Sequence, residues 1–179
     1  IHIDAQRQQL RTTRGSLPYR QLVLAHGAQA KLPAGVPADW CWRINHLDAY
    51  EKLRAALDGG SKDIAILGAG LIGSELANDL ALAGHRITLL ETQTQPLPAW
   101  RASNTGAPLL QAWQALPIRF VGGITLAQVQ ALPGSTGQRY RIRSQCGQSW
   151  EVDALIAATG LQTPSRLACS AALAWQDGI

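Results

Sequence analysis

The hydrophobic positions between residues 63 and 91 change period twice, and each change predicts a new element. The apolar run Ile64–Leu67 is typical of a fully buried strand. It leads into the glycine-rich segment Gly68–Gly73. Apolar residues then recur at helical spacing and predict one buried stripe, formed by Ile72, Leu76, Leu80 and Ala83. After Gly84 a second apolar run ends at Glu91. The pattern therefore predicts a strand, a tight turn, a helix and a second strand.

The glycine spacing G-x-G-x-x-G between a strand and a helix is the arrangement that holds a dinucleotide. Gly68 permits a sharp turn off the strand, Gly70 lets the backbone approach a pyrophosphate, and Gly73 lets the helix pack closely on the strand. The helix start, at Leu71 and Ile72, offers unpaired N–H groups and the positive end of the helix dipole. We therefore predict that these five residues bind a nicotinamide dinucleotide.

Glu91 follows Gly73 by 18 positions, about where an acid should bind the adenosine ribose of the dinucleotide. A carboxylate at this place accepts a hydrogen bond from the ribose hydroxyls of NAD and repels the 2′-phosphate of NADP. No Arg or Lys lies between Glu91 and Pro98 to reverse that preference. The sequence predicts binding of NAD(H). The alternative is a glycine turn in an α/β domain that binds no ligand.

The rest of the chain predicts further elements around this unit. Residues 1 to about 33 predict short strands, among them Leu22–Ala25, and Trp40 and Trp42 are interpreted as packing residues. A helix follows, capped by Asn45 or His46 and ended by Gly59-Gly60. Beyond Glu91 the predicted elements are a helix at Ala107–Leu116, a strand at Ile118–Val121, a meander at Ile124–Ala131, Gln138–Ser144 and Gln148–Val152, and a buried strand at Leu155–Ala158.

This order predicts an α/β fold: a Rossmann-like parallel sheet with helices on both faces and an antiparallel β-meander as the last crossover. A ligand should then lie at the carboxyl ends of the strands, where Gly68, Glu91 and Gly160 are placed.

Composition narrows the class of protein. The chain has 179 residues, 46% of them hydrophobic, and no apolar run approaches the ~20 residues of a membrane span. Its three cysteines are odd in number and far apart, which favours a reducing compartment over a disulfide framework. No metal-ligand spacing and no nucleic-acid motif occurs. The chain contains no Met, so we expect it to be part of a longer protein or a trimmed product.

The net charge of +4 is mild, but Arg139, Arg141 and Arg143 alternate along one predicted strand and would share one face. We interpret this face as the solvated outer side of a sheet. The alternative is a docking surface for an acidic partner or an anionic ligand.

Three stretches resemble the flavin-dependent pyridine nucleotide oxidoreductases. They are Tyr19–Gly27 (YRQLVLAHG), Gly68–Glu75 (GAGLIGSE) and Asp153–Gly160 (DALIAATG), followed by Pro164. They span most of the chain in the order of that family. Within it, Ile44–Tyr50 and Gly68–Leu80 are most similar to the rubredoxin–NAD(+) reductases. His26 stands where the family usually has Thr, which leaves the role of this position open.

The resemblance implies a domain organisation and a chemistry. Residues 1–33 would be a remnant of an FAD-binding domain, residues 34–160 the NAD(H)-binding domain, and residues 161–179 a connection back toward the FAD domain. Because the flavin-binding motifs of the family are missing, we expect this chain alone neither to hold FAD stably nor to be active. By position, Glu75 and Gly160 would lie near the nicotinamide, although Glu75 is equally well interpreted as an acid near the positive end of a helix.

The full-length protein would pass electrons from NADH through FAD to a small acidic iron–sulfur carrier such as rubredoxin, in the cytoplasm. The cofactors carry that chemistry, so no catalytic residue and no metal ligand is expected in this region. Two alternatives stay open. A stand-alone Rossmann dehydrogenase would need its own acid or base, and the pairing Tyr-x-x-x-Lys does not occur. A nucleotide-sensing module would share the glycine turn but have no flavin partner.

Overall fold

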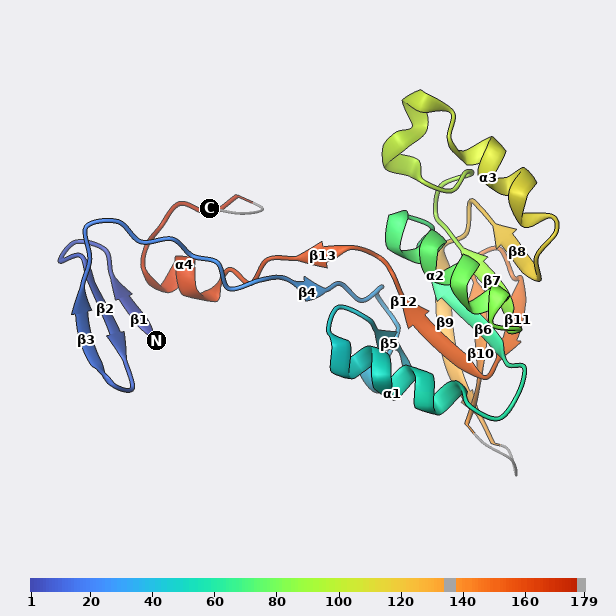
Figure 1. Ribbon diagram of the computed structural model, residues 1–179, viewed down its shortest axis with the longest axis horizontal. Coiled ribbons are helices and arrows are strands. Elements are labelled where there is room, and N and C mark those ends of the chain that lie inside the picture. The colour runs from blue at the N-terminus through green and yellow to red at the C-terminus, as the bar shows by residue number, and fades with distance from the viewer. Residues whose placement is uncertain (134–137, 177–179) are drawn as a thin grey trace. The chain divides into compact units, whose positions relative to one another are not determined.

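The computed structural model describes residues 1–133 and 138–176 and divides the chain into two compact units. One unit comprises residues 1–29 and 161–179, and the other comprises residues 30–160 (Figure 1). The short strands β4 (Gln29–Ala30) and β13 (Leu161–Gln162) lie where the chain passes between them. The assignment of residues 1–33 to an FAD-binding domain stays a prediction.

The first unit is a small antiparallel sheet with one short helix. Strands β1 (His2–Asp4), β2 (Gln9–Thr12) and β3 (Gly15–Pro18) pair in sequence order, and α4 (Arg166–Ser170) lies against β1. The predicted strand Leu22–Ala25 is wrong, because within residues 1–133 this segment pairs with no neighbouring strand. Val23 is 84% exposed. An apolar run forms a strand only where a partner satisfies its backbone and covers its side chains.

The second unit is built on a five-stranded parallel sheet in the order β5-β12-β6-β7-β8. Its strands are β5 (Trp42–Arg43), β6 (Asp63–Leu67), β7 (Arg86–Leu90), β8 (Ile118–Val121) and β12 (Ala154–Ala157). Ile66 pairs with Leu89 on one side and with Ile156 on the other. The parallel sheet and its α/β class are confirmed.

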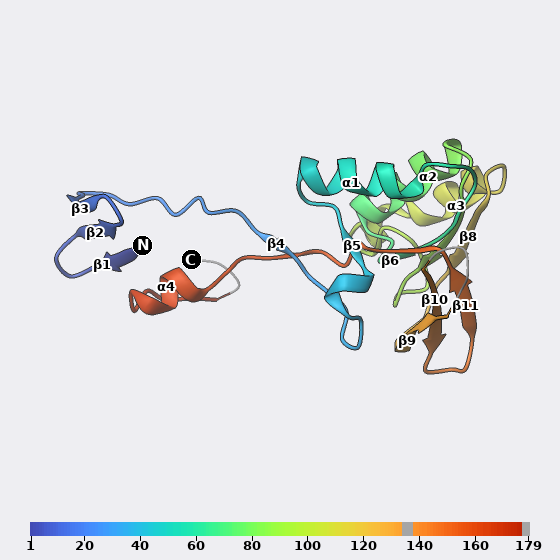
Figure 2. The ribbon, with the colours of Figure 1, turned by 90° about the horizontal axis from the view of Figure 1, so that it is seen from below.

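Residues that alternate along the central strands fill two separate cores. Ile64 and Ile66 face one cluster with side chains from α1 (Leu47–Leu57), α2 (Leu71–Leu82) and α3 (Gly106–Trp113). Ala65 and Leu67 face the other cluster, which contains Ile142 and residues of the antiparallel meander β9 (Leu126–Leu132), β10 (Arg139–Ser144) and β11 (Ser149–Val152). Figure 2 shows the three helices on one side of the sheet and the meander on the other.

The expectation of helices on both faces is therefore corrected in one respect: the second face is covered by strands. Strand order supplies the reason. The steps β5 to β6, β6 to β7 and β7 to β8 all advance the same way across the sheet, and right-handed crossovers put all three helices on one face. The step from β8 back to β12 runs the other way, so its connection, the predicted meander, lies on the opposite face.

The described residues of this unit also contain two 3-10 segments, η1 (Ala38–Trp40) before β5 and η2 (Pro98–Ser103) after β7. His46 caps α1, since its Nδ1 accepts a 3.3 Å hydrogen bond from the backbone N–H of Asp48. Gly59 and Gly60 follow the end of α1, as predicted.

Candidate functional site

The glycine turn lies at the carboxyl end of β6, between the ends of β7 and β12. Gly68 has φ of +97°, a conformation that side chains rarely adopt, and its N–H donates a 2.8 Å hydrogen bond to the carbonyl of Leu90. A Cβ added to Gly68 would lie 2.5 Å from the carbonyl oxygen of Ala158. The absence of a side chain at position 68 is therefore a requirement of the fold itself.

Gly73 and Gly70 differ in what surrounds them. A Cβ on Gly73 would overlap the carbonyl oxygen of Gly68, so this glycine lets the first turn of α2 rest directly on the turn. Gly70 has φ of −69°, and apart from its neighbours in the chain no heavy atom of the described residues lies within 4 Å of the position of its Cβ. Packing within the unit thus explains two of the three glycines. The third faces open space, as expected of a position kept bare for a ligand.

The start of α2 is a bare helix N-terminus. Gly70 is its N-cap residue, and within the described part of the chain no side chain caps it. The first turn contains no acid, so the N–H groups and the positive helix end are available to an anion. Leu71 and Ile72 are 54% and 46% exposed beside this end. The arrangement suits the pyrophosphate of a dinucleotide.

The predicted buried stripe of α2 is rotated in the structure. Ile72 is exposed and Leu76 and Leu80 are half-buried, whereas Gly73, Ala77 and Ala81 are buried. Small residues let the helix axis approach the sheet closely, and this close approach places the helix end over the turn. Glu75 is exposed in the second turn, where it is available to solvent or to a ligand.

Glu91 follows β7 directly and lies beside the turn, but it is buried and its carboxylate already has partners. Oε2 accepts a 2.7 Å hydrogen bond from the N–H of Ala69. Oε1 accepts one from the hydroxyl of Thr92 at 2.9 Å and one from the N–H of Gln93 at 3.1 Å. The sequence predicted the position of Glu91 but missed these three partners, because the pattern that identifies the acid says nothing about backbone donors across the turn.

A small cavity of about 270 Å³ lies beyond Glu91. It is lined by uncharged polar residues, prolines and one glycine: Thr92, Gln93, Thr94, Gln95, Pro96, Pro98 and Gly106. Its position in the chain, just after the acid, is where the adenosine end of a dinucleotide would extend.

The exit of β12 forms the other side of the site. Gly160 has φ of +91°, and its carbonyl accepts a 2.9 Å hydrogen bond from the N–H of Lys31. The hydroxyl of Thr159 donates a 2.6 Å bond to the carbonyl of Lys31. As at Gly70, no described heavy atom outside the neighbouring residues of the chain lies within 4 Å of a Cβ built on Gly160. The backbone here is fixed but uncovered, which is compatible with the predicted approach to the nicotinamide.

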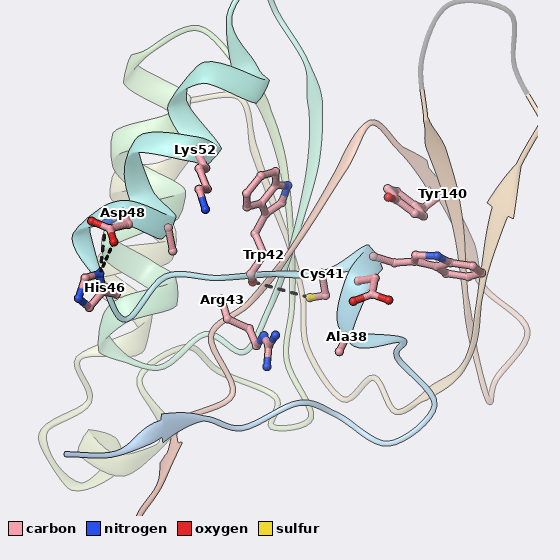
Figure 3. Close-up of a pocket in the computed structure, with 11 residues that line it drawn as sticks. Ala38, Cys41, Trp42, Arg43, His46, Asp48, Lys52 and Tyr140 are labelled. Carbon is pink, nitrogen blue, oxygen red and sulfur yellow. Dashed lines mark hydrogen bonds and ion pairs between the residues drawn. The ribbon is translucent and has the colours of Figure 1, made fainter. Parts of the chain in front are cut away.

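A second cavity, of about 450 Å³, lies where η1 and β5 meet the start of α1 (Figure 3). Trp40, Trp42, Arg43, Lys52 and Tyr140 are among its lining residues. The rings of Trp40 and Tyr140 are 5.9 Å apart and tilted by 40°. Trp40 packs on the meander-side core and Trp42 on the helix-side core, which confirms the interpretation of both as packing residues.

The alternating arginines lie on the outer face of the meander. Arg141 Nη2 is 2.5 Å from Oε1 of Glu151, and Arg139 Nε is 3.1 Å from Oδ1 of Asp153. The hydrogen bonds from Arg141 hold the pKa of the Glu151 carboxyl below its usual value. Glu151 and Asp153 thus neutralise Arg141 and Arg139, two of the three arginines. The structure therefore favours the interpretation of this face as the solvated outer side of a sheet.

Among residues 1–133 and 138–176, no group of His, Cys, Asp and Glu side chains is placed to hold a metal ion. In the same ranges no helix is long and apolar enough to span a bilayer.

Comparisons with known proteins agree with this geometry. The family model described as pyridine nucleotide-disulphide oxidoreductase matches residues 1–179. A nitric oxide reductase FlRd-NAD(+) reductase of Aeromonas hydrophila is 36% identical over 179 residues, which are 100% of this chain and 45% of that protein. A rubredoxin-NAD(+) reductase of Acinetobacter baylyi is 34% identical over 165 residues, 90% of this chain and 42% of that protein. The chain thus spans less than half the length of these relatives.

Among solved structures, the covalent complex of putidaredoxin reductase and putidaredoxin contains a chain that matches with a TM-score of 0.86 at 25% identity. The match covers 100% of this chain and 44% of that chain.

Proposed function

Because this chain belongs to the pyridine nucleotide-disulphide oxidoreductase family, we propose that it supplies the NAD(H)-binding domain of an FAD-dependent NADH oxidoreductase. In this proposal the whole protein passes electrons from NADH through the flavin to a small iron–sulfur carrier such as rubredoxin. The relatives named as rubredoxin and FlRd reductases support this choice of acceptor. The domain boundaries 1–33, 34–160 and 161–179 belong to the same proposal.

The observation that carries the proposal is the open space at Gly70. Its Cβ position is free although its φ would suit any residue, so the protein's own packing does not explain the glycine. An uncapped helix end lies directly behind it. A diphosphate needs both features: a backbone it can touch and N–H groups that point at it.

The chain's own residues divide the binding work. Gly68, Gly70 and Gly73 shape the hollow, and the N–H groups at Leu71 and Ile72 would hold the pyrophosphate. Glu91 would face the adenosine ribose and disfavour a 2′-phosphate. Glu75 and Gly160 would lie toward the nicotinamide. When bound, NADH supplies a hydride for transfer to a flavin, and this domain fixes its position and distance.

The remaining parts of the proposal concern the longer protein. The putidaredoxin reductase complex supports a small iron–sulfur protein as partner. The three cysteines, all free in the structure, favour a reducing compartment, which we propose to be the cytoplasm.

Two measurements test the proposal. Isothermal titration of this chain should give weak binding of NADH and weaker binding of NADPH. Absorption spectra of the longer product should reveal bound flavin that is bleached by NADH. Binding without flavin would favour the nucleotide-sensing module, and alcohol oxidation without flavin would favour the stand-alone dehydrogenase. If neither nucleotide binds, the proposal is wrong.

A further inference from the structure

We propose that Glu91 is a positioning residue: its carboxylate locks the glycine turn and the segment after β7 into one rigid unit, and so sets the geometry that grips the pyrophosphate. This inference rests on the proposed function and deepens it, because it gives the acid a second role besides facing the ribose.

The first support is where the carboxylate's hydrogen bonds go. One oxygen is bound by the N–H of Ala69 in the turn, and the other is bound by Thr92 and Gln93 on the following segment. The carboxylate therefore bridges two pieces of chain that are 22 residues apart. A carboxylate has about four acceptor positions, so three are occupied and one is left for a ribose hydroxyl.

The second support is the peptide group of Ala69, which is held on both sides. Its N–H donates to Glu91, while its carbonyl accepts from the N–H of Leu97 at 2.8 Å and from the hydroxyl of Ser74 at 3.2 Å. Leu97 comes from the same segment that Glu91 anchors. The residue between the first two glycines is thus fixed by the segment after β7 and by α2 together.

The third support is the position of this peptide next to Gly70. Gly70 is the residue that faces open space and is the N-cap position of α2, so the orientation of the preceding residue decides where its backbone points. Ala69 is fully buried, and Glu91 is only 9% exposed. A charged acceptor in such surroundings makes strong hydrogen bonds. Without the carboxylate, the buried N–H of Ala69 would be left unpaired, which costs free energy.

A double-mutant cycle between protein and ligand tests the inference. The protein change is Glu91→Gln, which keeps the shape but turns one acceptor into an amide donor. The ligand change is NADH whose adenosine lacks both ribose hydroxyls (2′,3′-dideoxyadenosine). If Glu91 also positions the turn, the variant binds both nucleotides roughly tenfold more weakly than the original chain, as expected for loss of a hydrogen bond to a charged group. If Glu91 acts only through the ribose hydroxyls, the variant and the original chain bind the deoxy nucleotide equally, and the inference is overturned.

A local readout separates positioning from general destabilisation. Amide hydrogen exchange at Ala69 should quicken in the variant, while exchange at Ile66 in the core of β6 should stay unchanged. Thr92→Val is the matched control, since it removes one of the three partners but leaves the hydrogen bond from the N–H of Ala69 to Glu91. Its affinity for the deoxy nucleotide should fall by less than that of Glu91→Gln. Unchanged exchange at Ala69 in Glu91→Gln would also overturn the inference.

Failure of the inference and failure of the proposed function give different results. If the unmodified chain binds neither NADH nor the deoxy nucleotide, the proposed function is wrong. If it binds both nucleotides and the cycle shows that Glu91 acts only through the ribose hydroxyls, the proposed function stands and only the positioning role is rejected.

Discussion

The carbonyl oxygen of Gly68 occupies the place that a side chain on Gly73 would need. The contact joins the first residue of the turn to the first turn of α2, and it brings the helix end to the carboxyl edge of the sheet. The site therefore depends on two kinds of glycine: those that the fold needs, at positions 68 and 73, and one that a ligand would need, at position 70.

Substitution of a glycine that the fold needs should lower the stability of the chain. In Gly73→Ala the new methyl group meets the carbonyl of Gly68, which is backbone and cannot move aside without shifting the turn. Overpacking of this kind costs about 1–3 kcal/mol. We expect urea unfolding, followed through the fluorescence of buried Trp113 and Trp150, to have a lower midpoint. An unchanged midpoint would mean that the helix relaxes away from the turn without cost.

Substitution of Gly70, the glycine that a ligand would need, should instead weaken binding and change stability little. In Gly70→Ala the φ of −69° is acceptable for alanine and the Cβ enters open space, so stability should fall by no more than about 1 kcal/mol, the N-cap difference between Gly and Ala. NADH binding, measured by calorimetry, should weaken by about tenfold or more, or about 1.4 kcal/mol. Gly70→Ala and Gly73→Ala are controls for each other. Equal NADH affinity in Gly70→Ala and the original chain would remove the main support for the site.

The core of this fold could be predicted from local pattern alone. Ile64–Leu67 is a short apolar run that ends at a glycine, the form typical of a buried parallel strand, and Ile118–Val121 lies between Pro117 and Gly122 with three apolar residues in four. The structure places β6 at Asp63–Leu67 and β8 at Ile118–Val121. The glycine turn could be predicted for the same reason, because its spacing encodes backbone requirements that are local.

What the pattern could not predict depends on distant neighbours. Leu22–Ala25 reads as a strand, but a strand needs a partner, which periodicity does not reveal. The face on which each helix lies follows from the order of strands in the sheet, so the single-sided helical layer could not be predicted before that order was known. The helical spacing of large apolar residues predicts a stripe through Leu76 and Leu80, whereas close approach to the sheet selects small residues. The buried face therefore includes Gly73, Ala77 and Ala81.

The amino ends of the strands predict an acid-sensitive contribution to stability. Arg86 binds Asp63 through two hydrogen bonds, Nε to Oδ1 at 2.7 Å and Nη2 to Oδ2 at 2.9 Å, and joins β7 to β6. The hydrogen bonds from Arg86 hold the pKa of Asp63 below its usual value. A carboxyl with a lowered folded-state pKa stabilises the fold above its unfolded pKa, near 3.9, and this stabilisation is lost as the pH falls through the folded value.

We therefore expect the urea midpoint of the original chain to fall between about pH 5 and pH 2, and Asp63→Asn to reduce that fall. Glu51→Gln, which removes a charge from an exposed position on α1, should leave it unchanged. Because the ion pair is partly exposed, the difference should be small and should shrink in high salt. If the urea midpoints of the original chain and of Asp63→Asn fall equally with pH, Asp63 does not cause the acid-sensitive part of the stability.

The thiols predict an order of chemical reactivity. Cys41 is buried, and burial raises its pKa to about 12, so on the order of 10⁻⁴ of it is ionised at pH 8. Cys146 is exposed in the turn between β10 and β11, and its sulfur lies 3.1 Å from the hydroxyl of Ser144, which lowers its pKa. With iodoacetamide at pH 8, mass spectrometry should find Cys146 modified early and Cys41 unmodified until the chain unfolds.

Ser144→Ala should slow the reaction of Cys146 because it raises the pKa of that thiol, while the exposed Cys169 reports any general change in the fold. Equal rates at Cys41 and Cys146 in the folded chain would contradict the burial of Cys41, and an unchanged rate in Ser144→Ala would contradict the role of the hydroxyl.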